Sequence, residues 1–175
     1  MPGGLRFSRP TPALARAQAR WIAAIEPWRG LGYQAAALGR YLARKARARA
    51  VWVVRRQPRG APLGVAVVDD GVLLGGFIAL LAVRPEASGQ GLGRALVGQV
   101  AARTFEARRW LYVSTDGKNG AALRFYRKLG FSRVGRLPDL VRRGRVEILL
   151  RKPAPSGITK IPARTPRVGY HGEAS

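Results

Sequence analysis

The sequence predicts an α/β protein in which a mixed, only partly parallel central sheet of about six to seven strands is flanked by about four helices. One observation behind this prediction is that short apolar runs alternate with longer segments whose apolar residues recur every three or four positions. The other is the order of these segments: a strand, two helices, three strands, a helix, a strand, a helix and two final strands. A sheet built in this order has both parallel and antiparallel neighbours.

In the first half of the chain we expect a short edge strand, two helices and three further strands. Thr11 and Pro12 form a helix start, because threonine caps a helix and proline suits its first position. Pro27 ends that helix. The dipeptide Asp70-Gly71 predicts a hairpin turn. The predicted strands are residues 5–9, 50–55, 63–69 and 72–83, and the predicted helices are residues 13–25 and 34–49.

The second half alternates between helices and strands and ends in a segment without periodicity. The predicted helices are residues 91–108 and 119–129, and the predicted strands are residues 110–114, 131–135 and 146–151. From Pro153 the chain is rich in proline and glycine, which predicts a disordered tail. We therefore expect one domain over residues 1–152, followed by a basic tail over residues 153–175.

The composition excludes several kinds of chemistry. The 175 residues include no cysteine, so disulfides, thiolate metal sites and a catalytic thiol are excluded. The one histidine, His171, lies in the predicted tail, so we expect no metal site and no catalytic triad. No apolar run reaches the roughly 18 residues that a membrane span needs. We expect a cytoplasmic monomer or homodimer without a membrane partner.

The net charge of +23 indicates anionic partners, such as a nucleotide cofactor, nucleic acid or the ribosome. Arginine clusters occur at residues 40–49, 55–59 and 142–145, and Tyr41 and Trp52 lie near them for base stacking. One hypothesis is therefore a module that binds RNA or the ribosome through its basic surface. The alternative is that these clusters are ordinary solvated faces.

A glycine-rich turn connects the predicted strand 72–83 to the helix that follows it. Gly89, Gly91 and Gly93 alternate along the stretch SGQGLGRAL. Unpaired amides and the positive end of a helix dipole form an anion site there, and glycines let a phosphate approach the backbone. Arg94-Ala95 does not match the P-loop, and the spacing G-x-G-x-G does not match the dinucleotide motif. A flexible strand-to-helix turn would also explain the glycines.

A second motif, NGAALRFYRKLGF (119–131), places Ala122, Phe125, Tyr126 and Leu129 on one helical face, and Gly130 ends the helix. With V-x-P-x-x-x-G-x-G-x-G-x-A-L at residues 83–96, the chain resembles the GNAT N-acetyltransferase superfamily. EPWRGLGY and LPDLV…EILLRK resemble bacterial members, including ribosomal-protein-alanine acetyltransferases. The resemblance covers roughly residues 5–152.

The resemblance implies the GNAT fold and an enzyme that moves an acetyl group from acetyl-coenzyme A to a primary amine, by direct attack of the amine. The acceptor would be a small molecule or a peptide N-terminus. Tyr126 matches the tyrosine that protonates the leaving thiolate, although a core aromatic would also fit this position. The residues that match the cofactor site are Leu81, Ala82, Val83, Ser88, Gly89, Gln90, Gly91, Leu92, Gly93, Arg94 and Asn119.

The chain departs from the superfamily pattern at the expected general base. Relatives carry an acid in one of two strands, and Ala79 and Tyr112 stand at those positions here. Replacement candidates are Glu26, Glu86 and Asp116, or a water relayed by a backbone carbonyl. Ser88 also stands where an arginine or glutamine is usual. The alternative to an enzyme is a catalytically weak GNAT-like module that binds RNA or the ribosome.

Overall fold

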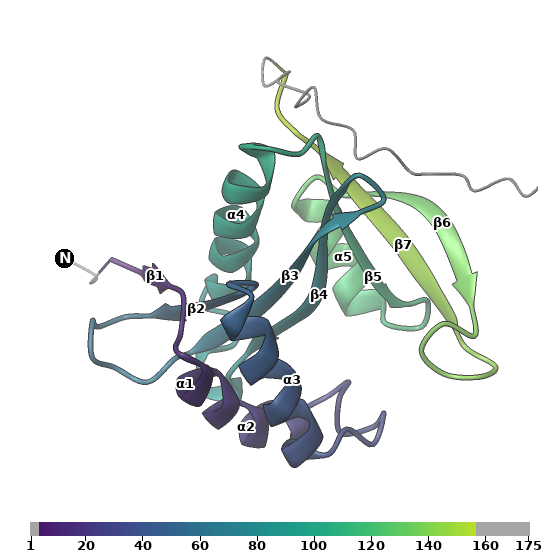
Figure 1. Ribbon diagram of the computed structural model, residues 1–175. Coiled ribbons are helices and arrows are strands. Elements are labelled where there is room, and N and C mark those ends of the chain that lie inside the picture. The colour runs from purple at the N-terminus through teal and green to yellow at the C-terminus, as the bar shows by residue number, and fades with distance from the viewer. Residues whose placement is uncertain (1–3, 157–175) are drawn as a thin grey trace, which may run out of the picture.

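The computed structural model describes residues 4–156 and follows the predicted order of elements (Figure 1). The strands are β1 (Arg6–Ser8), β2 (Val51–Arg55), β3 (Gly64–Val72), β4 (Gly75–Val83), β5 (Trp110–Asp116), β6 (Ser132–Pro138) and β7 (Val146–Pro153). The helices are α1 (Pro12–Ala17), α2 (Ala19–Ala23), α3 (Ala35–Arg47), α4 (Leu92–Phe105) and α5 (Gly120–Lys128), with a 3₁₀ turn, η1 (Pro85–Ala87).

The seven strands form one sheet in the order β1-β2-β3-β4-β5-β7-β6. Only β4 and β5 pair in parallel, and the other neighbours are antiparallel. This confirms the predicted mixed, partly parallel sheet. Because α1 and α2 follow one another directly, they stand in place of the first predicted helix, and the other three helices match the prediction.

Helices cover both faces of the sheet (Figure 1). Side chains along β2 alternate between the two faces: Val51 and Val53 pack with α1, α2 and α3, whereas Trp52 and Val54 pack with α4. The same alternation along β3 and β4 produces two hydrophobic cores, one on each face, whereas the buried apolar residues of β5 and β7 belong to the core on the α4 face. The residues of α5 that pack on the sheet belong to the core on the α4 face.

The first predicted helix is interrupted at Gln18, whose side chain is buried. Its side-chain nitrogen donates to the carbonyl of Leu14 at 2.9 Å, and its backbone amide instead donates to the carbonyl of Ala15 at 3.1 Å. The side chain thus competes with the backbone for the i−4 carbonyl. Prediction of one continuous helix over residues 13–25 was therefore wrong.

The predicted hairpin turn at Asp70-Gly71 was also wrong. The turn lies at Leu73-Leu74, where both residues have positive φ angles of 49° and 63°. Asp70 stays in the strand and receives two hydrogen bonds of 2.7 Å from Arg108, and Gly71 occupies a register shift. Pairing along the full length of β3 and β4 fixes this register, and it overrides the turn signal of the Asp-Gly dipeptide.

At the C-terminal end, β7 continues to Pro153, and the amide of Ala154 donates to the carbonyl of Arg109 at 2.8 Å. Ordered structure therefore extends past the predicted start of the tail. The predicted disorder of the tail and His171 otherwise lie outside the described residues. Among the helices of residues 4–156, none combines the length and the apolar character that crossing a membrane requires.

The parallel pairing of β4 with β5 is short, and its end positions the site. It runs only from Gly76 and Leu111 to Ile78 and Val113. On its other edge β4 pairs with β3, and the register shifts there so that Ala79 is an extra, bulged residue. Beyond this bulge β4 and β5 are no longer paired, so a gap opens between two neighbouring strands.

Substitution of Gly75 tests how tightly β4 must approach β5. A Cβ at Gly75 would lie 2.5 Å from the carbonyl oxygen of Trp110, whereas a Cβ at Gly98 in α4 would contact nothing within 4 Å. We expect Gly75→Ala to lower the free energy of unfolding by about 1–3 kcal/mol, because backbone must shift. Gly98→Ala should raise it by about 0.5–1 kcal/mol, because alanine favours helix.

Urea denaturation of both variants and of the wild type measures these changes in the free energy of unfolding. Equal stability of Gly75→Ala and the wild type would contradict the close approach of the two strands.

Candidate active site

A cavity of about 510 Å³ lies where β4 and β5 separate. It is lined by β4, β5, α5, the loop between α2 and α3, and the loop between β6 and β7. Its lining residues include Glu26, Trp28, Leu31, Tyr33, Ala79, Leu81, Ser114, Asp116, Lys118, Asn119, Tyr126, Val141, Arg142, Arg145 and Glu147.

The open edge of β4 forms one wall of this region. Leu81, Ala82 and Val83 pair with β3 on one side, and no strand pairs with them on the side that faces β5. An unpaired strand edge offers amides and carbonyls to an extended ligand, in the way that an added strand would use them. Three predicted cofactor-binding residues therefore lie where backbone groups are free to bind.

The glycine-rich turn follows β4 through η1. No backbone acceptor is found, among the described residues, for the six amides from Gly89 to Arg94, although the next amide, that of Ala95, donates to Gly91. Gly89 and Gly91 have φ angles of 75° and 79°, and a Cβ on either would contact nothing within 4 Å. These free amides and the N-terminus of α4 make an open anion site.

Side chains around this turn hold it in place. Gln90 donates to the carbonyl of Glu86 at 3.1 Å and accepts a hydrogen bond from Arg56. Arg56 belongs to the predicted basic cluster at residues 55–59, and it therefore brings positive charge to the anion site. Ser88 ends η1, and its amide donates to Pro85 at 3.1 Å.

The second motif forms α5 and contributes two residues to the cavity. Asn119 caps the helix, since its side-chain oxygen accepts from the amide of Ala122 at 3.0 Å, and its side-chain nitrogen remains a donor. Tyr126 is buried between Phe125 and Phe131, with ring centroids 5.0 and 5.4 Å apart in edge-to-face geometry. Burial raises the pKa of Tyr126, so this phenol keeps its proton at neutral pH.

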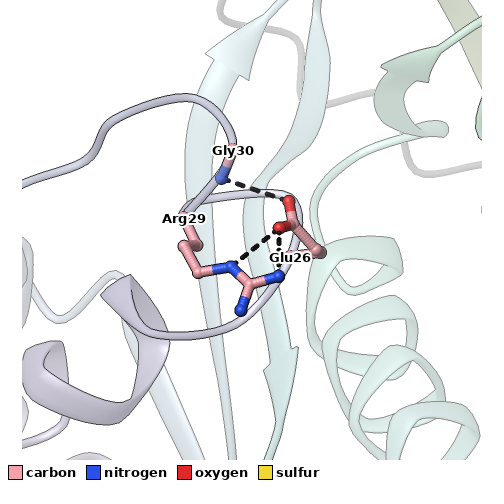
Figure 2. Close-up of polar contacts among 3 residues, drawn as sticks. All are labelled: Glu26, Arg29 and Gly30. Atoms are coloured by element: carbon pink, nitrogen blue, oxygen red, sulfur yellow. Dashed lines mark hydrogen bonds and ion pairs between the residues drawn. The ribbon is translucent and has the colours of Figure 1, made fainter.

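Of the three predicted replacement bases, Glu26 and Asp116 line the cavity and Glu86 does not. Figure 2 shows that the carboxylate of Glu26 is occupied: it pairs with Arg29 at 2.9 Å and accepts from the amide of Gly30 at 3.1 Å. A Cβ at Gly30 would lie 2.6 Å from a carboxylate oxygen of Glu26, so a side chain there would displace this carboxylate. Glu26 thus has a structural role in the α2–α3 loop.

Asp116 is also engaged. It accepts from the amide of Lys118 at 2.7 Å and pairs with Arg145 at 2.5 Å. The Lys118 amide first, and then Arg145, hold the pKa of Asp116 below its ordinary value. The buried Nε of Arg145 has no hydrogen-bond partner among the described residues, so it remains a donor for an oxygen of a bound molecule.

Glu147 is a cavity residue that sequence reasoning missed. It lies on β7 directly opposite Asp116 of β5, and only 7% of its surface is exposed. Burial first, and then the charge of Asp116, raise the pKa of Glu147, while a hydrogen bond from Ser114 and the charge of Arg145 act in the opposite direction. The available signal was an acid inside the apolar strand VEILL.

The side chains of Tyr112 and Trp52 both lie outside this cavity. Tyr112 is not among the cavity residues, and its ring instead lies against Gly75. Trp52 is buried, with the guanidinium of Arg9 3.7 Å above its ring, so it does not offer a face for a nucleic-acid base. The expectation that Trp52 stacks on RNA therefore has no support from the structure.

Known proteins share this architecture. A family model described as an acetyltransferase (GNAT) domain matches residues 47–133. A GNAT-family acetyltransferase from Bacillus cereus is 15% identical with a TM-score of 0.72, over 87% of this chain and 99% of that one. The ribosomal-protein-S18-alanine N-acetyltransferase from Escherichia coli is 20% identical with a TM-score of 0.60, over 86% and 94%. A chain of the NatC complex bound to Gag peptide and CoA is 21% identical with a TM-score of 0.61, over 85% and 98%.

No curated protein sequence matches the chain. The family match includes β2 to β5, the glycine-rich turn, α4 and α5. The chain therefore belongs to the GNAT family, and its fold is the GNAT fold. This makes it an acetyl-CoA-dependent N-acetyltransferase.

The raised pKa of Glu147 leads to a stability prediction. A carboxyl whose pKa is higher in the folded than in the unfolded protein stabilises the fold when protonated, and this contribution is lost as pH rises through the folded pKa. Glu147→Gln should therefore increase the free energy of unfolding at neutral pH. The increase should shrink as pH falls toward the ordinary glutamate pKa of about 4.3.

Urea denaturation at several pH values makes this measurement, with Glu106→Gln as the control because Glu106 is exposed and forms only a surface ion pair with Arg103. Lower stability of Glu147→Gln at neutral pH would contradict the burial of an ionised carboxylate.

Proposed function

We propose that this enzyme transfers the acetyl group of acetyl-CoA to a primary amine that enters the cavity from the side opposite the glycine-rich turn. The observation that carries the proposal is that the open edge of β4 is followed, after η1, by the free amides from Gly89 to Arg94. The strand edge suits the extended pantetheine arm, and the amides suit its pyrophosphate. Asn119 and Ser88 are the flanking polar contacts of this site.

The acceptor side of the cavity is rimmed by apolar and charged groups. Trp28, Leu31, Tyr33 and Val141 supply the apolar part from the two loops. The carboxylates of Glu26, Asp116 and Glu147 also line the cavity, and they are three of only nine acids in the chain. Their gathering in one place of a strongly basic protein favours an ammonium group.

Both acceptor classes, a small amine and a peptide N-terminus, fit these features. The cations Lys118, Arg142 and Arg145 line the same cavity, so an acceptor that also carries a carbonyl or carboxylate oxygen would find donors beside the carboxylates. A cytoplasmic location, a monomer or homodimer, and contact with nucleic acid or the ribosome stay predictions.

The reaction is a direct attack of the amine on the thioester carbonyl. A backbone amide near Val83 stabilises the negative charge that develops on the carbonyl oxygen. The hydroxyl of Tyr126 supports the departing sulfur by donating its proton. Because the phenol is buried, the thiolate also leaves into a site of low polarity, where its own affinity for a proton rises.

A matched pair of glycine variants tests the cofactor site. Gly91 and Gly71 have nearly the same φ angles, 79° and 81°, and a Cβ on either would contact nothing within 4 Å. Each glutamate variant therefore adds the same charge at a position with a left-handed φ angle. Calorimetric titration with acetyl-CoA should show micromolar binding for the wild type and Gly71→Glu, and no binding for Gly91→Glu.

Equal binding by both variants would place the cofactor elsewhere. No binding by the wild type at high micromolar acetyl-CoA would reject the proposed function itself.

A further inference from the structure

The reaction needs a group that takes a proton from the acceptor, because a primary ammonium has no lone pair with which to attack. Ala79 and Tyr112, at the positions where related proteins carry an acid, supply no such group. The cavity contains three carboxylates, those of Glu26, Asp116 and Glu147. Their surroundings differ enough to separate their roles.

Glu26 and Asp116 are both neutralised by cations. Glu26 is mostly exposed and holds Arg29 and the Gly30 amide (Figure 2). Asp116 holds Arg145 and the Lys118 amide. A carboxylate in such contacts is a weak proton acceptor, since protonation would break them.

Glu147 differs from these two acids in its lack of a cation partner and in its burial. It has no ion pair within the part of the chain that the structure describes, and its side chain is buried at the cavity wall. Ser114 lines the cavity with it from β5, two residues before Asp116, the partner of Glu147 across the strands, and therefore on the same face of the sheet. The position of Glu147 is fixed by two rigid neighbours, since β7 pairs with β5 on one side and with β6 on the other.

We propose that Glu147 is the general base of this acetyltransferase, taking the proton from the acceptor ammonium within the cavity. This inference rests on the proposed function. It assigns the base to β7, in place of the two strands where the resemblance led us to expect it.

Each turnover moves two protons away from the acceptor nitrogen. The ammonium gives one proton to Glu147 and becomes a neutral amine. After the nitrogen–carbon bond has formed and the carbon–sulfur bond has broken, the nitrogen gives up a second proton. Tyr126 donates its proton to the sulfur and is reprotonated by this second one. The proton on Glu147 then passes to solvent, so one proton is released per turnover.

The charged groups that face Glu147 come from four elements. Asp116 on β5 raises its proton affinity, and Arg145 in the β6–β7 loop lowers it. Arg142 lines the cavity from the same loop as Arg145, whereas Lys118 lines it from the β5–α5 loop and Glu26 from the α2–α3 loop. The ion pair between Asp116 and Arg145 keeps the net effect of these two groups small, so burial dominates at Glu147.

The test compares Glu147→Gln with Glu106→Gln, a control on the distant end of α4. Acetyl-CoA binding is measured first by calorimetry, and both variants should bind like the wild type. Turnover of glycinamide is then followed by release of CoA thiol between pH 6 and 10. At pH 7 Glu147→Gln should be about 10²–10⁴-fold slower, as expected for loss of a general base.

This gap should close near pH 9, where an α-amine with a pKa of about 8 is already neutral in solution. Tyr126→Phe should also be slower, but by a similar factor at every pH below the phenol's own titration. Equal turnover of Glu147→Gln and the wild type at pH 7, or a deficit that does not depend on pH, would overturn the proposal. Absent acetyl-CoA binding by the wild type would reject the proposed function instead.

A second measurement does not depend on the choice of acceptor. Carboxyl ¹³C NMR of the labelled protein, with the Glu147 signal assigned by its loss in Glu147→Gln, should show a titration midpoint above the ordinary glutamate value of about 4.3. A midpoint at or below that value would overturn the proposal, even if glycinamide is not a substrate.

Discussion

Backbone hydrogen bonding between β4 and β5 stops after Ile78 and Val113, and the rest of the site depends on where it stops. Strand edges inside a sheet are ordinarily paired, because unpaired amides and carbonyls are costly when they are shielded from water. Here the bulge at Ala79 ends the pairing, and the edge of residues 79–83 is left for a ligand. After η1, where the amides of Ala87 and Ser88 are hydrogen-bonded, the glycine-rich turn supplies a second set of free amides at the N-terminus of α4. One interruption in the sheet thus positions both ends of the proposed cofactor site.

The same gap brings acids of a protein with a net charge of +23 to the proposed acceptor side of the cavity. Since the gap passes through the sheet, residues of β5 and β7 reach the cavity from one face and Tyr126 reaches it from the other. The carboxylates of Asp116 and Glu147 meet there as cross-strand neighbours. The positive surface around them suits the phosphates of the cofactor, and the local acids suit the amine. The electrostatic potential at each part of the site is therefore set by the nearby residues and not by the net charge of the whole chain.

Much of the fold and the cofactor site was predictable because its signals are local. Gly89 and Gly91 are favoured by their own positive φ angles, and Asn119 caps the helix that begins one residue later. Glu147 was missed because its burial and its neighbour depend on the pairing of β5 with β7, which joins segments about thirty positions apart. The true hairpin turn at Leu73-Leu74 was missed because the register of two neighbouring strands overrode the Asp-Gly signal. The break at Gln18 arises from a side chain that bonds its own helix, and composition alone does not reveal this.

The central claim is that two sets of unpaired backbone groups, one on the edge of β4 and one at the first turn of α4, hold the cofactor. The most direct measurement is a titration of ¹⁵N-labelled protein with CoA, following each backbone amide by NMR. We predict that the largest shifts fall on residues 79–83 and on Gly89–Arg94, and that they saturate with a single binding constant. Shifts confined to other surfaces, such as the basic cavity around Arg9 and Arg103, with the Gly89–Arg94 amides unchanged, would contradict the account.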